Sequence, residues 1–60
     1  MTYGGFTATV KQLDGGIEVI YADLDGKELE REQFPGVDDY SSKTEHVSSR
    51  LKQFWEQRGY

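Results

Sequence analysis

Cysteine is absent from the 60 residues of this chain, and proline and tryptophan each occur once. Without cysteine the chain has no disulfide to stabilise it and no thiolate ligands for a structural zinc site. No apolar run approaches the roughly 20 residues that a membrane-spanning helix requires. The first residues also lack the basic region and the apolar stretch of a secretory signal. We therefore expect a cytoplasmic protein without a membrane segment.

Recognisable catalytic, nucleotide and metal motifs are also missing. Neither G-x-G-x-x-G nor G-x-x-x-x-G-K-S/T occurs among the 7 glycines. His46 is the single histidine, and we interpret it as a helix-surface residue beside Arg50 instead of a catalytic base or metal ligand. Asp23 and Asp25 imitate the spacing of an EF-hand calcium loop, but Tyr21 stands where the first carboxylate ligand is needed. The expectation is a protein that is not an enzyme and that has no cofactor and no metal.

Positive charge is scarce in the first two thirds of the chain. Residues 1–40 contain nine acidic and three basic residues, whereas residues 41–60 contain two acidic and four basic residues. The formal net charge of −4 opposes non-specific binding to nucleic acid, although a local basic face remains compatible with it. The row of Glu28, Glu30 and Glu32 is interpreted as a solvated strand edge that discourages aggregation. Its alternative role is an acidic stripe for a basic partner.

Two Asp-Gly turns organise the first half of the chain. Residues 6–13 alternate as a half-buried strand does, and residues 17–22 form the most strand-like stretch. Asp14-Gly15 joins them as a tight hairpin turn. A two-residue loop sets Lys11 opposite Glu18 on one face and gathers apolar residues on the other. The members of this apolar face are Phe6, Ala8, Val10, Ile17, Val19 and Tyr21.

Residues 27–34 follow the second turn, Asp25-Gly26, and allow two interpretations. A third, edge strand fits the preceding hairpin turn and the stop at Pro35-Gly36. A short helix fits the helix-forming residues, and Asp25 with Glu28 imitates a capping box. As a strand, the segment places three glutamates on one side, and we expect that these charges cannot lie under a helix. The strand would then either project beyond the core or pair with a bulge.

An amphipathic helix is predicted over residues 42–58, after a loop at 35–41. Ser42 and Glu45 match the S-x-x-E capping box with Ser42 as N-cap, and Gly59 suits the C-terminal end. The apolar residues that recur at helical spacing are Val47, Leu51, Phe54 and Trp55. The expected fold is therefore α+β, a single small domain in the order β-β-β-α. A three-stranded antiparallel β-meander, over about residues 5–34, packs against one C-terminal α-helix.

Residues 6–10 and 14–26 resemble the opening of HicB-type antitoxins, in which a similar run ends in an aromatic-Pro-Asp-Leu-Pro-Gly segment. Here Ala22 and Asp25 replace the two prolines, and residues 27–34 lengthen the path to the helix. The β-β-β-α order is also similar to the arm-site DNA-binding domains of tyrosine recombinases, which read DNA through a basic sheet, whereas this sheet is acidic. A nucleic-acid-binding module of either kind is the alternative function, with basic residues contacting phosphates. Its candidate contacts are Lys43, Arg50, Lys52 and Arg58.

One helix covers only one face of a three-stranded sheet, so the other face needs an explanation. That face carries more apolar surface than an isolated small protein normally exposes. Either the N-terminal arm or Tyr60 folds over it, or it binds another protein or a second copy of the chain. We expect a small non-catalytic binding or regulatory protein that acts through this face, with a homodimer as one form. The candidate binding residues are Thr7, Thr9, Lys11, Ile20, Ala22, Leu24, Leu29 and Arg31.

Overall fold

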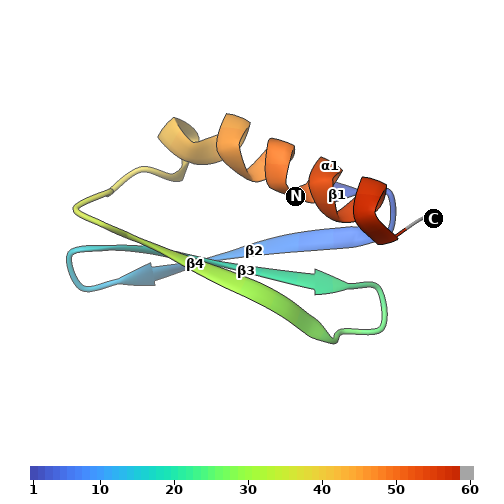
Figure 1. The fold of residues 1–60 in the computed structure, drawn as a ribbon. Helices are drawn as coiled ribbons and strands as arrows, with labels where there is room; N and C mark the ends of the chain where they lie inside the picture. Colours follow the sequence, from blue (N-terminus) through green and yellow to red (C-terminus); the bar gives the residue numbers. More distant parts are fainter. Residues whose placement is uncertain (59–60) are drawn as a thin grey trace.

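A computed structural model describes residues 1–58 and shows an antiparallel sheet crossed on one face by a C-terminal helix (Figure 1). The strands are β1 (Thr2–Tyr3), β2 (Phe6–Leu13), β3 (Gly16–Asp23) and β4 (Glu28–Pro35). A 3₁₀ turn, η1 (Tyr40–Lys43), leads into the helix α1 (Thr44–Arg58). The strands lie in the sheet in their chain order. The predicted α+β class with one C-terminal helix is confirmed.

The pairing of β2 with β3 confirms the predicted register. Leu13 pairs with Gly16, so Asp14 and Gly15 alone form the turn. Gly15 has a φ of 77°, the left-handed conformation that a tight hairpin turn requires and that glycine adopts without a steric cost. Because side chains alternate along each strand, this register gathers the predicted apolar set on one face of the sheet.

β1 is a strand that the sequence analysis did not predict. It pairs with the first residues of β2, and Met1 extends the pairing through two backbone hydrogen bonds with Ala8, of 2.8 and 3.0 Å. The sheet therefore has four strands, and the prediction of three is corrected. A strand of two residues is too short to show alternation, and its turn at Gly4-Gly5 lacks the Asp-Gly pattern of the other two turns.

Residues 28–35 form an edge strand, so the strand interpretation of this stretch is confirmed and the short helix is wrong. Glu30 pairs with Tyr21. The next pair is Glu28 with Ala22, so Leu29 is the extra residue of a β-bulge. Leu29 packs against the core beneath α1. Its predicted place on the uncovered face is therefore wrong, because the bulge interrupts the strict alternation of side chains.

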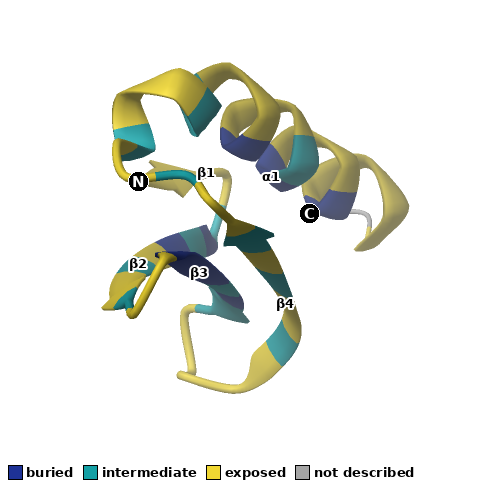
Figure 2. Ribbon diagram, turned by 90° about the vertical axis from the view of Figure 1, so that its left-hand side faces the viewer, coloured by how far each residue is buried: buried dark blue, intermediate teal, exposed yellow. Residues whose placement is uncertain are grey.

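The core fills the space between α1 and the sheet. In Figure 2 the buried residues lie on β2 and β3 and on the side of α1 that faces them. The ring of Phe54 packs against Tyr21 and Phe6, with centroids 5.3 and 6.1 Å apart. The predicted apolar stripe of the helix is thus confirmed for Val47, Leu51 and Phe54, whereas Trp55 is exposed and lies outside the core. The buried apolar residues are Phe6, Ala8, Ile17, Val19, Tyr21, Val47, Leu51 and Phe54.

The helix starts differently from the prediction. α1 begins at Thr44, after the 3₁₀ turn, and the N-cap of that turn is Asp39. The Asp39 carboxylate accepts hydrogen bonds from the N–H and the hydroxyl of Ser41, at 3.0 and 2.6 Å. Ser42 lies inside the turn and donates its hydroxyl to the Asp39 carbonyl oxygen at 2.8 Å. The predicted capping box at Ser42 is therefore wrong, because the aspartate caps the chain three residues earlier.

Candidate functional site on the uncovered sheet face

The face of the sheet opposite α1 is formed by alternate residues of β2, β3 and β4. Leu24 follows β3 in the turn and is 72% exposed, the highest value among the large apolar residues that the structure describes. Six of the eight residues predicted to bind a partner lie on this face, as their pairing register requires. These six are Thr7, Thr9, Lys11, Ile20, Ala22 and Arg31.

Of the two predicted covers, the N-terminal arm does not lie on this face. The N-terminal arm forms β1, which extends the sheet beside β2 instead of folding over it. Tyr60, the other predicted cover, and Gly59, the predicted end of the helix, lie outside the described residues. Within residues 1–58, the helix and the sheet form two layers, and no third layer is present on the far side of the sheet (Figures 1 and 2).

Apolar surface on this face is concentrated toward the β3–β4 turn. Ile20 and Ala22 are partly buried, whereas Leu24 beyond them is largely exposed. Thr7 pairs with Ala22 across β2 and β3, and the Thr7 hydroxyl donates to the Ala22 carbonyl oxygen at 3.4 Å. The apolar part of the face is therefore Ile20 and Ala22, both partly buried, and the exposed Leu24 follows them in the turn.

A charged network runs along the β3–β4 side of this face, from Glu18, which pairs with Gln33, to Glu28, which pairs with Ala22. Glu18 is only 6% exposed, and its carboxylate accepts hydrogen bonds from Gln33 at 2.9 Å and from Arg31 at 3.5 Å. Arg31 also binds Glu28 through two nitrogens, at 2.5 and 2.9 Å. These hydrogen bonds from Arg31 lower the pKa of the Glu28 carboxyl group. Sequence reasoning missed the network because its members meet only through the β3–β4 register and its bulge.

Lys11 stands opposite Glu18, as the register predicts. The Glu18 carboxylate nevertheless binds side chains of β4, on the other side of β3. Lys11 is exposed and forms no ion pair with the part of the chain that the structure describes. One cation on the uncovered face is therefore available to a partner.

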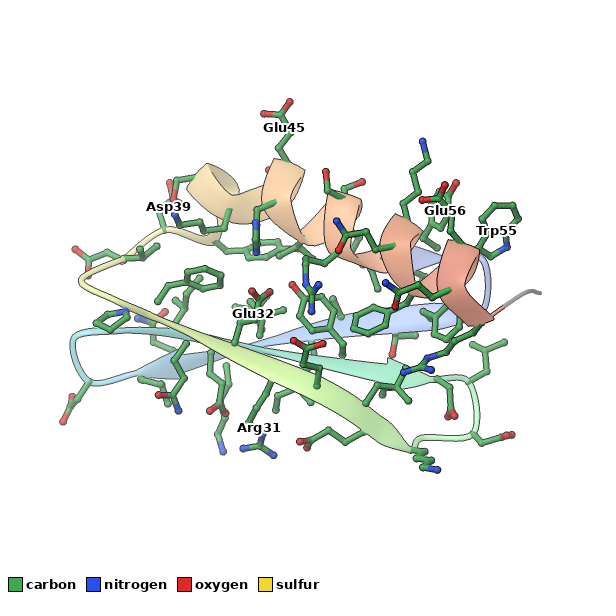
Figure 3. All side chains as sticks on the ribbon, viewed as in Figure 1. Arg31, Glu32, Asp39, Glu45, Trp55 and Glu56 are labelled. Carbon is green, nitrogen blue, oxygen red and sulfur yellow. The ribbon has the colours of Figure 1, made fainter. Side chains whose placement is uncertain are left out.

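A second polar cluster joins β4 to α1 on the opposite face, where Figure 3 shows Glu32 between helix and sheet. The Tyr21 hydroxyl donates to Glu32 at 2.5 Å, and Nε2 of His46 lies 3.0 and 3.1 Å from the two carboxylate oxygens. Arg50 binds Glu30 at 2.5 Å and lies 3.8 Å from Glu32. The expectation that these charges cannot lie under a helix is therefore wrong for two of the glutamates, since the helix supplies their partners.

The ionisation of this cluster follows from its contacts. Burial raises the pKa of Glu32, but hydrogen bonds from Tyr21 and His46 and the charge of Arg50 outweigh it, so the pKa lies below the usual 4.5. Burial and the hydrogen bond to Glu32 raise the pKa of the Tyr21 hydroxyl well above 10.0. At neutral pH the cluster therefore keeps an ionised acceptor and a protonated donor. Its glutamates are partnered within the molecule, which weakens the interpretation of β4 as an acidic stripe for a basic partner.

The four basic residues of the alternative nucleic-acid surface differ in their surroundings. Arg50 binds Glu30, and its side chain is only 23% exposed. Lys43 and Arg58 lie over aromatic rings, at 5.2 and 5.6 Å from the ring centroids. Lys52 is exposed and makes no ion pair with any described residue. The charge of one of the four candidates is thus neutralised within the molecule.

Tyr3 and Trp55 form an exposed aromatic pair that the sequence analysis gave no binding role. They are 39% and 38% exposed, and their rings meet edge to face with centroids 6.1 Å apart. Gly4, between β1 and β2, has a φ of 56° and lies so close to the indole that a Cβ there would overlap it. Figure 3 shows Trp55 at the C-terminal part of α1. No local sequence pattern indicates this contact, because Tyr3 and Trp55 lie near opposite ends of the sequence.

Residues 1–58 contain neither a candidate metal-binding group nor a candidate membrane-spanning helix. Between residues 1 and 58, no three or more His, Asp or Glu side chains gather in a way that could hold a metal ion. Asp23, part of the calcium-like spacing, instead accepts hydrogen bonds from the N–H groups of Asp25 and Lys27, both at 3.0 Å, and closes the turn. No helix in this part of the chain is long and apolar enough to cross a membrane.

The fold and the site together define a small α+β protein whose antiparallel sheet, within residues 1–58, is covered by a helix on one face only. No protein-family model matches the chain, and no curated protein and no solved structure matches it. A function for this protein must therefore be inferred from its own surfaces.

Proposed function

We propose that the chain is a small non-catalytic binding or regulatory protein that contacts another protein, or a second copy of itself, through the uncovered sheet face. The observation that carries the proposal is the apolar surface of Ile20 and Ala22 on a face that no described layer covers, next to the exposed Leu24 in the turn after β3. Burial of apolar surface contributes about 25 cal/mol per Å², so covering this surface favours association.

The charged network beside this apolar surface would give the contact its specificity. Arg31 and Glu28 are about half exposed and are held together by two hydrogen bonds, while Arg31 also reaches the buried Glu18. Charged groups that are already fixed in the free protein lose little conformational freedom on binding. A partner is therefore expected to present charges complementary to this fixed pattern.

Association through this face is expected to be reversible. The accessible surface of the chain is 3996 Å², and the scaling of surface with mass gives about 4000 Å² for a monomer of this length. The chain thus closes its own core without help from a partner. Binding should add to a folded monomer and should not be a condition for folding.

Sedimentation velocity over a concentration series up to the millimolar range tests the homodimer. We expect a concentration-dependent dimer that Leu24→Asn weakens, because the substitution removes the most exposed apolar side chain without touching the core. Lys52→Gln is the matched control on the helix and should leave the dimer unchanged. A monomer at every concentration would overturn the homodimer form of the proposal.

Nucleic-acid binding is a second and less supported proposal. Lys43, Lys52 and Arg58 lie outside ion pairs with described residues, whereas Arg50 is neutralised by Glu30. Phosphate contacts from the remaining residues would give a mobility shift that weakens with added salt. The triple substitution of these residues to glutamine should abolish such a shift, and the absence of any shift at low salt would end this alternative.

A further inference from the structure

The outer edge of β2 is only partly covered by another strand. β1 and Met1 pair with residues 6–8, and within residues 1–58 no strand lies beside residues 9–13. The edge of a sheet presents backbone donors and acceptors that can pair with an added strand. Along this edge Thr9, Lys11 and Gln12 are exposed, while Val10 is partly buried because its side chain packs against the core.

The direction of the free backbone groups follows from the pairing of Ala8. Its N–H and C=O groups both bond to Met1 and thus point away from β3. In an antiparallel strand the hydrogen-bonding direction alternates from one residue to the next. Val10 and Gln12 therefore direct their N–H and C=O groups outward, whereas Thr9 and Lys11 direct theirs toward β3. The edge offers two donor–acceptor pairs, about 7 Å apart.

The opposite edge of the sheet is protected in ways that this edge is not. β4 carries the charged side chains of Glu28, Glu30 and Arg31, contains a bulge and ends at Pro35. Charges, bulges and proline on an edge strand all hinder pairing with another chain. Residues 9–13 contain none of these except one charge, that of Lys11. Strand addition is therefore favoured at β2 over β4.

Lys11 indicates what kind of strand fits. Its ammonium group makes no ion pair with the described part of the chain, because Glu18 binds Gln33 and Arg31 instead. Residues directly opposite one another on neighbouring strands have Cβ atoms about 4.5–5.5 Å apart, and like charges there are destabilising. Two copies of β2 paired symmetrically about Lys11 would place two lysines opposite one another. An acidic residue at that position would instead complement the lysine.

We propose that residues 9–13 of β2 accept an extended segment of a partner protein as a fifth strand, with an aspartate or glutamate of that segment opposite Lys11. The backbone groups of Val10 and Gln12 hold the segment, and Lys11 selects its charge. The proposal does not depend on the apolar surface around Leu24. Failure of either binding surface can therefore be recognised separately.

Hydrogen exchange measured by NMR, residue by residue, tests the proposal with a blocked peptide of sequence Thr-Val-Asp-Val-Thr. We expect the peptide to slow exchange of the Val10 and Gln12 amides. The amides of Thr9 and Lys11 already bond to β3 and should not change. The β4 edge amides of Arg31 and Gln33 should not change either. Unchanged exchange at Val10 and Gln12 with millimolar peptide would overturn the proposal.

Gln12→Pro tests whether the outward N–H group is the binding element. Proline removes this donor but leaves the β2–β3 ladder intact, since the Gln12 N–H takes no part in it. Gln12→Ala is the matched control, because both variants lose the side-chain hydrogen bond to the Gly16 carbonyl oxygen, of 3.3 Å. The alanine variant should bind the peptide and the proline variant should not. Equal binding by the two variants would overturn the proposal.

A modified peptide tests the same backbone hydrogen bonds without a substitution in the protein. N-methylation of the two peptide amides that face β2 removes their donors, and this peptide should not slow exchange in the wild-type chain. Binding that survives N-methylation would show side-chain contacts alone and would contradict strand addition. Because this test uses the wild-type protein, its result does not depend on the stability of the Gln12→Pro variant.

Reversing the charge of the peptide residue or of Lys11 tests the role of this lysine. The wild-type chain should bind the aspartate peptide about two- to fivefold more tightly than the matched Thr-Val-Lys-Val-Thr peptide. Lys11→Glu should reverse this preference, and an unchanged preference would overturn the acidic assignment. Protection of Val10 and Gln12 that rises with protein concentration, without peptide, would assign the edge to a second copy and overturn the partner segment.

Discussion

The two faces of the sheet satisfy their carboxylates in opposite ways. On the helix side, Glu30 and Glu32 bind Arg50 and His46, which come from the second layer. On the uncovered side, none of the described residues forms a second layer over Glu18, and yet Glu18 is only 6% exposed. Its partners are neighbours in the same sheet, so cross-strand register alone can bury and satisfy a charged group.

Because of this difference, the residues that stabilise the fold lie mainly on the helix side of the sheet. The helix side holds the apolar core and ties β4 to α1, so its residues are committed to the fold. The uncovered side uses few apolar side chains for packing and keeps its charges fixed at the surface. We therefore expect substitutions on the helix side to cost more folding free energy than similar substitutions on the uncovered side.

The largest expected contrast comes from the same change made on each side. Leu51 is fully buried and Leu24 is 72% exposed. Leu51→Ala should lower the free energy of unfolding by about 2–5 kcal/mol, through lost burial and a new cavity. Leu24→Ala should change it by less than about 0.5 kcal/mol. Urea denaturation measures both, and similar costs for the two variants would contradict the division between the faces.

Removing the Tyr21 hydroxyl should have the next largest effect. Tyr21→Phe keeps the buried ring but deprives ionised Glu32 of a hydrogen bond of 2.5 Å. Hydrogen bonds to charged groups contribute about 1.5–3 kcal/mol, so the free energy of unfolding should fall by that order. Tyr3→Phe is the control, since the ring of Tyr3 is partly exposed and its hydroxyl has no partner among the described residues. A loss as large in the control would argue against the cluster as the cause.

Acid should weaken the tie between β4 and α1 by a smaller amount. The pKa of Glu32 is lower in the folded chain than its usual 4.5, so the ionised group stabilises the fold above that pH. This contribution is lost as the pH falls through the folded pKa of Glu32. Glu32→Gln cannot titrate, so its stability should fall less steeply below pH 4.5 than that of the wild type. Parallel acid profiles, followed by circular dichroism, would contradict the assignment.

A small effect is also expected from Glu18 on the uncovered face. Glu18→Gln keeps the shape of the side chain and its contact with Gln33 but removes the charge near Arg31. Arg31 is half exposed, and exposed ion pairs contribute about 0–1 kcal/mol. The free energy of unfolding should therefore fall by less than about 1 kcal/mol in urea denaturation. A loss comparable with that of Tyr21→Phe would show that this face, too, is committed to the fold.

The register of the central hairpin could be predicted because it depends on neighbours in the chain. Asp14-Gly15 determines the loop, and the alternation on either side then permits one pairing only. The place of Leu29 could not be predicted, because the bulge depends on how Glu28 pairs with Ala22 in another strand. The helix start was missed because Ser42 and Asp39 are both good caps, and only the path of the chain after β4 selects Asp39.

The residues of the uncovered face also divide into those that could be predicted from the sequence and those that could not. Six of its eight residues follow from alternation along β2, β3 and β4, and that period is a local property of extended backbone. The partners of Glu18 could not be found this way, since Gln33 and Arg31 reach it only once the third pairing is in place. The Tyr3–Trp55 contact joins residues near opposite ends of the sequence and has no local pattern.

The sequence by itself determined the layers of this protein. Side-chain alternation, Asp-Gly turns and the helical period of Val47, Leu51 and Phe54 act over a few residues, so steric preference and burial specify them without reference to the rest of the chain. Only the tertiary structure decided the partners of the charges. Glu32 lies under the helix and Glu18 is buried on the open face because ion pairs depend on long-range register and on where α1 crosses the sheet.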